Sequence, residues 1–263
     1  AMVNFYPGFS NMSSRALYFG ELIEKKALER ARCFVACSNW AAASAIRDYG
    51  ISEKKVRVIH YYAGVELAPD KAVVRPAEPM DVCRLLFVGV EWERKGGEIA
   101  VDTVNMLNQL GIPGKLTIVS GKSIPERHKG NPFIEETGYL DRKTLEGRRR
   151  YDELFATAHF FILPTRAECL AQVFCDAAAF GLPALATDIG AEADVVQNDV
   201  NGYRLPLSAG GRDYAMKIAE IWRDENKYNA MCLNGRKLFD SRLALDVWRR
   251  EMDQVVQYVL GKQ

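Results

Sequence analysis

Short apolar runs alternate with stretches of helical periodicity along most of the chain. Runs of strand length occupy residues 33–37, 56–59, 85–88, 116–119, 133–136, 159–163, 184–187 and 202–205. Apolar residues recur every three to four positions over residues 13–32, 38–49, 97–110, 141–154 and 173–180, and three further helices are expected towards the end. Strands that alternate with helices pair in parallel through right-handed crossovers. The pattern therefore predicts an α/β fold with a doubly wound parallel sheet, in which ligands bind beyond the carboxyl ends of the strands.

Breaks in the periodicity divide the chain. Ser38 and Gly50 have the residue types that begin and end a helix. Residues 61–81 lose any regular pattern and contain three prolines, which is typical of a linker. We expect four parts: an N-terminal part over 1–62, a linker over 63–82, a main lobe over 83–240 and a last helix over 241–263.

Composition excludes several classes of protein. The 35 basic and 34 acidic residues nearly cancel, so no overall field favours nucleic acid or an anionic membrane. No apolar run has the length of a membrane span, and no targeting segment is evident. The 6 cysteines form no CxxC pair and stand among apolar residues, which predicts buried free thiols in a reducing cytoplasm. The 3 histidines are too dispersed for a zinc cluster.

A glycine-rich basic loop follows the strand over residues 85–88. Gly89 ends this strand, and Arg94 and Lys95 precede Gly96 and Gly97 at the start of a helix. Helix-start amides carry partial positive charge, and cations beside them neutralise phosphate oxygens. The loop therefore predicts a diphosphate site, with a merely charged surface loop as the alternative.

Two carboxylates follow the strand over 159–163. Glu168 lies just beyond the strand, and Asp176 lies eight positions later on the next helix. A carboxylate accepts hydrogen bonds from adjacent hydroxyls, so the pair could hold a sugar ring and a ribose. The alternative is one charge at a helix N-terminus and one solvated residue.

The same residues resemble a known family. The segment from Pro164 to Pro183 is similar to the Glu-x7-Glu signature of family 4 retaining glycosyltransferases, which have the GT-B fold of two Rossmann-like lobes. The segment 88–96 resembles the family's strand-Gly-Arg-loop-Lys-Gly element, and 137–140 resembles its Gly-Tyr segment. The resemblance is densest over 84–206 and identifies this part as the C-terminal, nucleotide-sugar-binding lobe.

The resemblance implies a function and a set of site residues. A sugar would pass from a nucleotide sugar, UDP- or GDP-linked, to a carbohydrate or other acceptor with retention of configuration and without a cofactor. Lys95 would contact the diphosphate, Glu168 the sugar and Asp176 the ribose, with Arg94 supporting Lys95. The full set of expected donor-binding residues is Gly89, Gly96, Gly97, Gly138, Tyr139, Glu168, Cys169, Leu170, Ala171 and Asp176. No Asp-x-Asp occurs, so we expect no metal at the diphosphate.

Three positions depart from the family pattern. Val90 stands in place of arginine, Asp176 in place of the second glutamate and Ala171 in place of a loop glycine. Arg94 would supply the absent charge, and Ala171 would still offer its backbone amide. These departures favour weakened donor binding and leave open a catalytically inactive sugar-nucleotide-binding module.

The family also sets expectations for the ends of the chain. Residues 13–63 resemble the end of its N-terminal lobe, whose bulk is missing, so we expect a truncated chain that transfers no sugar alone. The last helix is expected to cross over and pack on this remnant, because its apolar residues recur at helical spacing. A nucleotide-sugar epimerase or a phosphorylase of the same fold stays open as an alternative.

Overall fold

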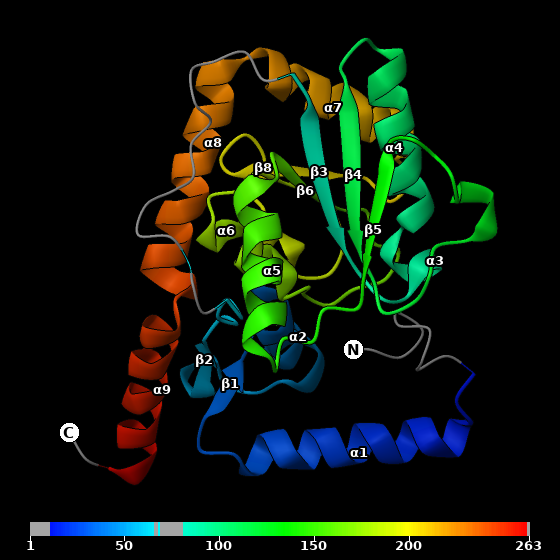
Figure 1. Ribbon diagram of the computed structural model, residues 1–263. Coiled ribbons are helices and arrows are strands. Elements are labelled where there is room, and N and C mark those ends of the chain that lie inside the picture. The colour runs from blue at the N-terminus through cyan, green and yellow to red at the C-terminus, as the bar shows by residue number, and fades with distance from the viewer. Residues whose placement is uncertain (1–10, 66–67, 69–80, 262–263) are drawn as a thin grey trace.

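A six-stranded parallel sheet forms the centre of the molecule. The computed structural model describes residues 11–65, 68 and 81–261. In order across the sheet, the strands are β5 (Ile134–Gly138), β4 (Gly114–Val119), β3 (Cys83–Val88), β6 (Phe160–Leu163), β7 (Ala184–Thr187) and β8 (Gly202–Leu205), and all neighbours are parallel. Figure 1 shows helices on both faces of this sheet, so the predicted doubly wound α/β fold is confirmed.

Successive residues of β6 show how the two helical layers are built. Phe161 meets Phe155 of α5 (Leu145–Thr157) and Phe174 of α6 (Val173–Ala179), whereas Phe160 meets Trp222 of α7 (Gly211–Arg223). Neighbouring side chains of a strand point to opposite faces, so α5 and α6 cover one face and α7 the other. The second layer also contains α4 (Gly97–Gln109), which packs along α7. Every residue of β6 is buried because both faces are covered.

The N-terminal region is a smaller unit with its own pair of strands. It comprises α1 (Ser14–Arg30), β1 (Phe34–Ala36), α2 (Asn39–Tyr49), a 3-10 turn η2 (Glu53–Lys55) and β2 (Val56–Val58), and β1 pairs with β2 in parallel. The expected caps of α2 are confirmed: Ser38 Oγ accepts from the Ala41 N–H at 3.1 Å, and Gly50 has a positive φ of 67°. Residues 66–67 and 69–80 of the predicted linker lie outside the described residues.

The last helix packs on this N-terminal region. A π-helical turn, η5 (Phe239–Leu243), joins α8 (Glu225–Leu238) to α9 (Leu245–Leu260). On α9, the Trp248 ring lies 5.3 Å from the Tyr62 ring, and the Tyr258 ring lies 5.2 Å below the Arg57 guanidinium. These contacts place α9 against residues of the N-terminal region, and the proposed division into domains, with its crossover helix, stays a prediction.

Several details differ from the sequence prediction. The helix expected from Asp141 begins at Leu145, because Thr144 Oγ1 caps it by accepting from the Gly147 N–H at 3.0 Å. A short helix, α3 (Trp92–Lys95), occupies the loop after β3. No disulfide forms among the described cysteines, but only Cys83, Cys175 and Cys232 are buried; Cys33, Cys37 and Cys169 are partly exposed. Cys33 and Cys37 flank β1, and the two-stranded sheet of β1 and β2 is too small to bury the residues around it.

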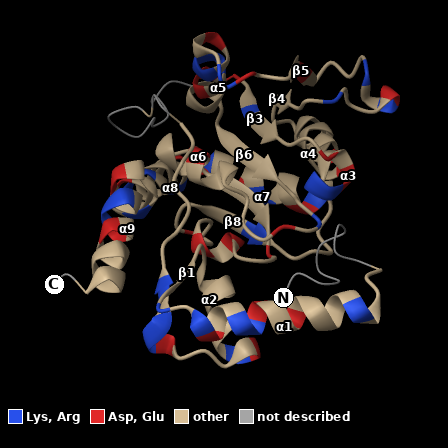
Figure 2. Ribbon diagram, turned by 90° about the horizontal axis from the view of Figure 1, so that it is seen from below, with Lys and Arg blue, Asp and Glu red and all other residues tan. Residues whose placement is uncertain are grey.

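The surface carries charges of both signs. Figure 2 shows basic and acidic residues interspersed along α1 and α9, in line with the nearly balanced composition. Within the part of the chain that the structure describes, no helix combines the length and the apolar character that a membrane span requires.

Candidate functional site

The order of strands places two loops side by side at the centre of the sheet. The chain proceeds from β3 outward to β4 and β5, then returns to β6 beside β3 and proceeds the other way to β7 and β8. The point between β3 and β6 is therefore a topological switch point, where the loops diverge and leave room for a ligand. Lys95 follows β3 and Glu168 follows β6, so the fold brings both predicted residues to this point.

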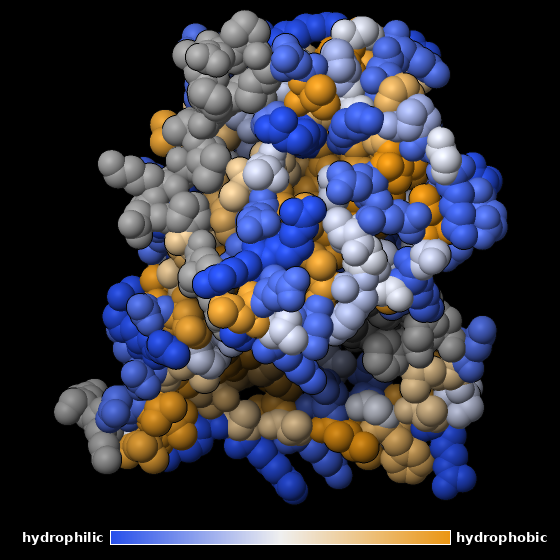
Figure 3. All heavy atoms as spheres, in the orientation of Figure 1, coloured by the Kyte–Doolittle hydropathy of each residue, from blue (hydrophilic) through white to orange (hydrophobic). Residues whose placement is uncertain are grey.

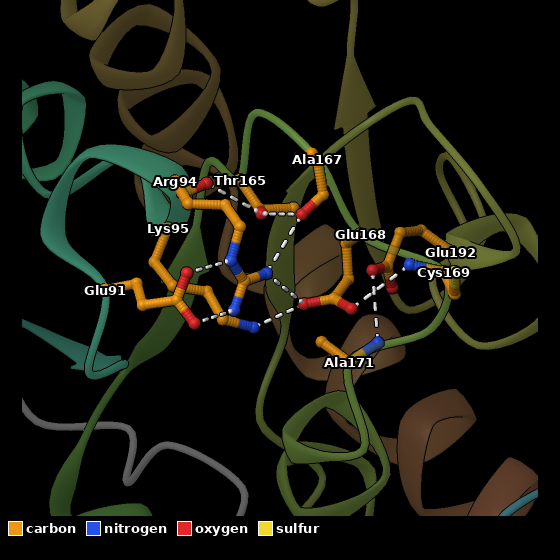
Figure 4. Close-up of polar contacts among 9 residues, drawn as sticks. All are labelled: Glu91, Arg94, Lys95, Thr165, Ala167, Glu168, Cys169, Ala171 and Glu192. Carbon is orange, nitrogen blue, oxygen red and sulfur yellow. Dashed lines mark hydrogen bonds and ion pairs between the residues drawn. The ribbon is translucent and has the colours of Figure 1, made fainter. Parts of the chain in front are cut away.

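An ion-pair cluster forms where the two loops meet (Figure 4). The Lys95 ammonium donates to Glu168 Oε2, and Arg94 donates to the same oxygen at 3.1 Å. Arg94 also donates to Glu91 through Nε at 2.7 Å. The side chains of Lys95, Arg94 and Glu168 are only 14%, 13% and 11% exposed, whereas that of Glu91 is 58% exposed. Two nearly buried cations thus share one nearly buried carboxylate.

The cluster keeps Glu168 ionised. Burial raises the pKa of a carboxyl group, but the charge and hydrogen bond of Lys95, the Cys169 amide and the charge of Arg94 outweigh it, so the pKa of Glu168 lies below its usual value. The Cys169 N–H donates to Glu168 Oε1 at 3.1 Å. Both carboxylate oxygens are therefore occupied, and the side chain is held in one orientation.

Backbone contacts lock the two loops together. The carbonyl of Arg94 accepts from the Arg166 N–H at 2.7 Å and from Thr165 Oγ1 at 3.0 Å. Gly96 has a φ of 77°, and a Cβ there would lie 2.0 Å from the carbonyl oxygen of Pro164. The contact between the loops therefore requires a glycine at this position. The sequence interpretation gave another reason for it, the close approach of a phosphate.

Two further glycines of the predicted set also lie against protein atoms. A Cβ on Gly97 would meet the Trp92 ring at 2.4 Å, and one on Gly89 would meet Lys95 Cβ at 3.1 Å. Gly89 therefore packs along the stem of Lys95 and helps to direct it. Their role in donor binding stays a prediction.

The loop after Glu168 differs from expectation at Ala171. The sequence interpretation assigned the Ala171 amide to the donor, but this N–H donates to Glu192 Oε1 at 3.2 Å, so it is already occupied. Leu170 and Ala171 are 8% and 5% exposed, whereas Cys169 is partly exposed. The functional prediction missed Glu192, because its position 24 residues after Glu168 gives no sign that the two segments meet.

Asp176 lies apart from the ion-pair cluster. It is 2% exposed, its Oδ1 accepts from the Gly64 N–H at 2.5 Å and its Oδ2 from the Tyr151 hydroxyl at 2.8 Å. Burial raises the pKa of Asp176 against the opposing effect of Tyr151, Arg142 and Gly64. The alternative of a solvated carboxylate is wrong, and a ribose would have to reach a side chain that is almost fully buried.

The remaining predicted residues lie at the end of β5. Gly138 is the last residue of this strand and has a φ of 72°. The side chain of Tyr139 is 72% exposed. Val90, where the family pattern has arginine, is 52% exposed on the loop after β3. The predicted part of Gly138 and Tyr139 in donor binding stays a prediction.

A cleft of about 600 Å³ separates the Glu168 loop from the N-terminal region. One wall consists of Glu168, Cys169 and Leu170, and the other consists of residues of α1, β1 and α2, among them Glu24, Leu28 and Trp40. Figure 3 shows the hollow above α1 at the base of the molecule. The sequence analysis assigned no site residue to the N-terminal wall, because the residues of this wall form no motif of their own.

Metal ligands are not gathered at this site. Among the residues that the structure describes, no group of three or more histidine, cysteine, aspartate or glutamate side chains could hold a metal ion. The expectation of metal independence is a separate statement about the reaction and stays a prediction.

Solved structures define the class of the fold. A glycosyltransferase from Rickettsia africae covers 96% of this chain with a TM-score of 0.72 at 16% identity, over 69% of its own length. Sucrose-phosphate synthase from Thermosynechococcus elongatus covers 95% with a TM-score of 0.68 at 19% identity, over 64% of its length. HepE of Anabaena, solved with UDP and glucose, covers 92% with a TM-score of 0.66 at 14% identity, over 68% of its length. The chain therefore has the fold of GT-B glycosyltransferases.

The family follows from the sequence. The model of the family described as glycosyl transferases group 1 matches residues 83–224, which is just over half of the chain. The chain belongs to this family of glycosyltransferases. No curated protein matches the sequence. The chain spans 47% to 69% of the length of the similar solved structures.

Proposed function

We propose that this chain is the donor-binding part of a retaining, family 4-like glycosyltransferase. It would bind a UDP- or GDP-linked hexose without a metal ion and present it to a carbohydrate or other acceptor. The observation that supports this proposal is the meeting of Lys95 and Arg94 with Glu168 at the switch point of the sheet. Two cations and one carboxylate match a ligand that has a diphosphate at one end and hydroxyl groups at the other.

The ligands of similar proteins favour this class of donor. HepE of Anabaena has been solved with UDP-glucose, and a pneumococcal O-GlcNAc transferase with UDP and GlcNAc. These proteins share 15% and 13% identity with this chain, so their ligands suggest the donor class and leave the individual base and sugar open.

The resting cluster suggests how a donor would be received. The diphosphate would take over the cations of Lys95 and Arg94, which would release Glu168 to accept hydrogen bonds from sugar hydroxyls. In the transfer, the bond from the anomeric carbon to the diphosphate oxygen breaks and a bond to the acceptor oxygen forms on the same face. The acceptor proton passes to the departing phosphate oxygen. Cations fixed beside that oxygen stabilise its developing charge by several kcal/mol.

A binding module without catalysis is the second candidate. It is favoured by Asp176, whose two oxygens are engaged by Gly64 and Tyr151, and by Val90 at the position of the usual arginine. The similar structures contain further residues outside the part that this chain matches. In the proposed transferase, residues of that kind would complete the site. We therefore expect this chain alone to bind the donor without turnover, and sugar transfer by the isolated chain would contradict that expectation.

A thermal-shift screen of UDP- and GDP-sugars first selects the nucleotide. Calorimetric titration of wild type and three variants with the selected nucleotide and its sugar, for example UDP and UDP-glucose, then tests the proposal. Lys95→Ala should weaken both ligands roughly ten- to a hundredfold, because a charge-assisted contact is lost. Glu168→Gln should weaken the sugar nucleotide alone, since it leaves Lys95 free for phosphate. Lys227→Ala is the matched control, because this lysine also pairs with a carboxylate, Glu220, at 2.8 Å.

The outcomes are distinct. Equal losses of UDP affinity in Lys95→Ala and Glu168→Gln would overturn the assignment of roles. Failure of every sugar nucleotide to bind the wild-type chain would overturn the proposed function itself.

A further inference from the structure

The segment 190–192 supports the Glu168 loop from behind through three contacts. The Ala191 N–H donates to the Cys169 carbonyl at 2.6 Å. A Cβ on Gly190 would lie 2.3 Å from the Glu168 carbonyl oxygen, so the two backbones are in direct contact. Glu192 Oε1 accepts from the Ala171 N–H. In Figure 4, Glu168 stands between its two cations on one side and Glu192 on the other.

Glu192 is the unusual member of this segment. Its side chain is 0% exposed, and its second oxygen, Oε2, is buried without a hydrogen-bond partner among the residues that the structure describes. An unpaired neutral carboxyl oxygen is far less costly to bury than an ionised carboxylate in the same place. The free energy of burial therefore favours the protonated form of Glu192.

The surroundings of Glu192 favour the same form. The charged and titratable groups that act on it or respond to it are Glu168, Lys95, Arg204, Cys169 and Cys175. Burial and the charge of Glu168 raise the pKa of Glu192 to about 8, against the opposing effects of the Ala171 amide, Lys95 and Arg204. Lys95 is already matched by Glu168 and is not available as a full counter-charge.

We propose that Glu192 is a positioning residue that holds the Glu168–Ala171 loop as a neutral carboxylic acid. In this form it fixes the Ala171 amide without adding a second negative charge behind Glu168. Loss of its proton at alkaline pH places a second carboxylate behind the Glu168 loop and lowers the net positive charge that Lys95 and Arg94 offer to a diphosphate. This inference rests on the proposed function for its effect on the donor, while the protonation of Glu192 stands apart from any ligand.

Thermal unfolding without ligand tests the protonation. The folded chain keeps a proton on Glu192 that the unfolded chain releases above its ordinary pKa, so the folded state loses stability as pH rises from the ordinary carboxyl range to about 8. Between pH 6 and pH 9, the melting temperature of wild type should fall by several degrees more than that of Glu192→Gln. Asp213→Asn, which alters an exposed carboxylate that accepts from the Gly210 N–H at 2.9 Å, should follow wild type. Equal falls in wild type and Glu192→Gln would overturn the neutral carboxyl.

Titration with UDP at pH 6 and pH 9 tests the positioning role. Glu192→Gln retains an acceptor for the Ala171 amide, so at pH 6 it should bind UDP within about threefold of wild type. Between pH 6 and pH 9, its affinity for UDP should fall less than that of wild type. Glu192→Ala removes the acceptor and should lose about tenfold at both values, by analogy with a lost buried hydrogen bond. Unchanged UDP affinity in Glu192→Ala, in a protein that still melts cooperatively, would overturn the positioning role. GDP replaces UDP in this titration if the wild type binds only GDP-sugars. If no sugar nucleotide binds wild type, the proposed function fails while the unfolding result still decides the protonation.

Discussion

The two regions of this molecule use the same alternation of strands and helices, but they differ in how much of it they bury. The C-terminal lobe covers six strands on both faces, and its core extends from Cys83 to Leu243. The N-terminal region has two paired strands, and its separate core consists of Leu28, Ala45 and Ile51. A two-stranded sheet is marginal by itself in water. The smaller region therefore depends on contacts with the larger one, and so does the cleft that lies between them.

The largest expected effect is in the core of the C-terminal lobe. Phe161 is fully buried between Phe155 and Phe174, so Phe161→Ala should lower the free energy of unfolding by about 3–5 kcal/mol. Urea unfolding measures this loss. Phe161→Leu keeps most of the volume and should cost much less. A loss below about 1 kcal/mol in the alanine variant would contradict the assignment of the main core.

A smaller and more local effect is expected in the N-terminal core. Leu28 is 5% exposed, so Leu28→Ala should cost about 2–3 kcal/mol, at the low end of the range for buried leucine because its few neighbours can collapse into the space. Hydrogen exchange should accelerate in β1 and α2 and remain unchanged in β3 and β6. If hydrogen exchange accelerated equally in β3, the two regions would unfold as one cooperative unit, and the contrast between them would not hold.

The same contrast explains what the sequence could predict. Apolar runs buried on both faces predict strands well, and the bounds of the fully buried β7 agree with the prediction to the residue. The rule that ligands bind beyond the carboxyl ends of the strands then places the loops that carry Lys95 and Glu168 at one edge of the sheet, whereas their meeting depends on the strand order that puts β3 beside β6. The caps of α2 at Ser38 and Gly50 were predicted because a helix cap depends on residues that are close together in the sequence.

The features of the candidate site that sequence reasoning missed depend on contacts between distant segments. Asp176 occupies the position of a ribose ligand in the motif, but Gly64 and Tyr151 surround it. The amide of Ala171 faces Glu192, which no spacing rule connects to it. A motif fixes where a carboxylate lies along the chain, whereas its partners follow from the packing of other elements.

The junction between the two regions should respond to pH. Asp194 accepts from the Asn39 N–H at 2.6 Å and from Asn39 Nδ2 at 3.0 Å, and it lies 3.5 Å from His60 Nε2. Burial raises the pKa of Asp194, but His60 and Asn39 outweigh it and hold this pKa below the usual value. Asp194 therefore stabilises the folded state above the ordinary carboxyl pKa, and this contribution is lost as pH falls below about 4.

The corresponding variant is Asp194→Asn. It should cost about 1–2 kcal/mol at pH 7, since charged hydrogen bonds to the start of α2 are weakened, and the difference from wild type should shrink at pH 3. Unfolding followed at both values measures this. Asp213→Asn is the control, because Asp213 is an exposed carboxylate at the start of α7 on the C-terminal lobe, where it accepts from the Gly210 N–H at 2.9 Å. A difference from wild type that persists unchanged at pH 3 would exclude the charge as the cause.

The smallest expected effect concerns the aromatic pair that attaches α9. The rings of Tyr62 and Trp248 are tilted at 59° with centroids 5.3 Å apart, and both residues are partly exposed. Aromatic pairs contribute about 0.5–1.5 kcal/mol beyond the area that they bury, and partial exposure favours the lower part of this range. A double-mutant cycle with Tyr62→Ala and Trp248→Ala isolates this coupling from the loss of each ring. The fully buried pair Phe161 and Phe174, with centroids 5.4 Å apart, gives the matched cycle in the C-terminal lobe and should show the stronger coupling. If the Tyr62–Trp248 coupling equals or exceeds it, α9 binds the N-terminal region as firmly as the main core is packed, and the smaller region is not the weaker unit.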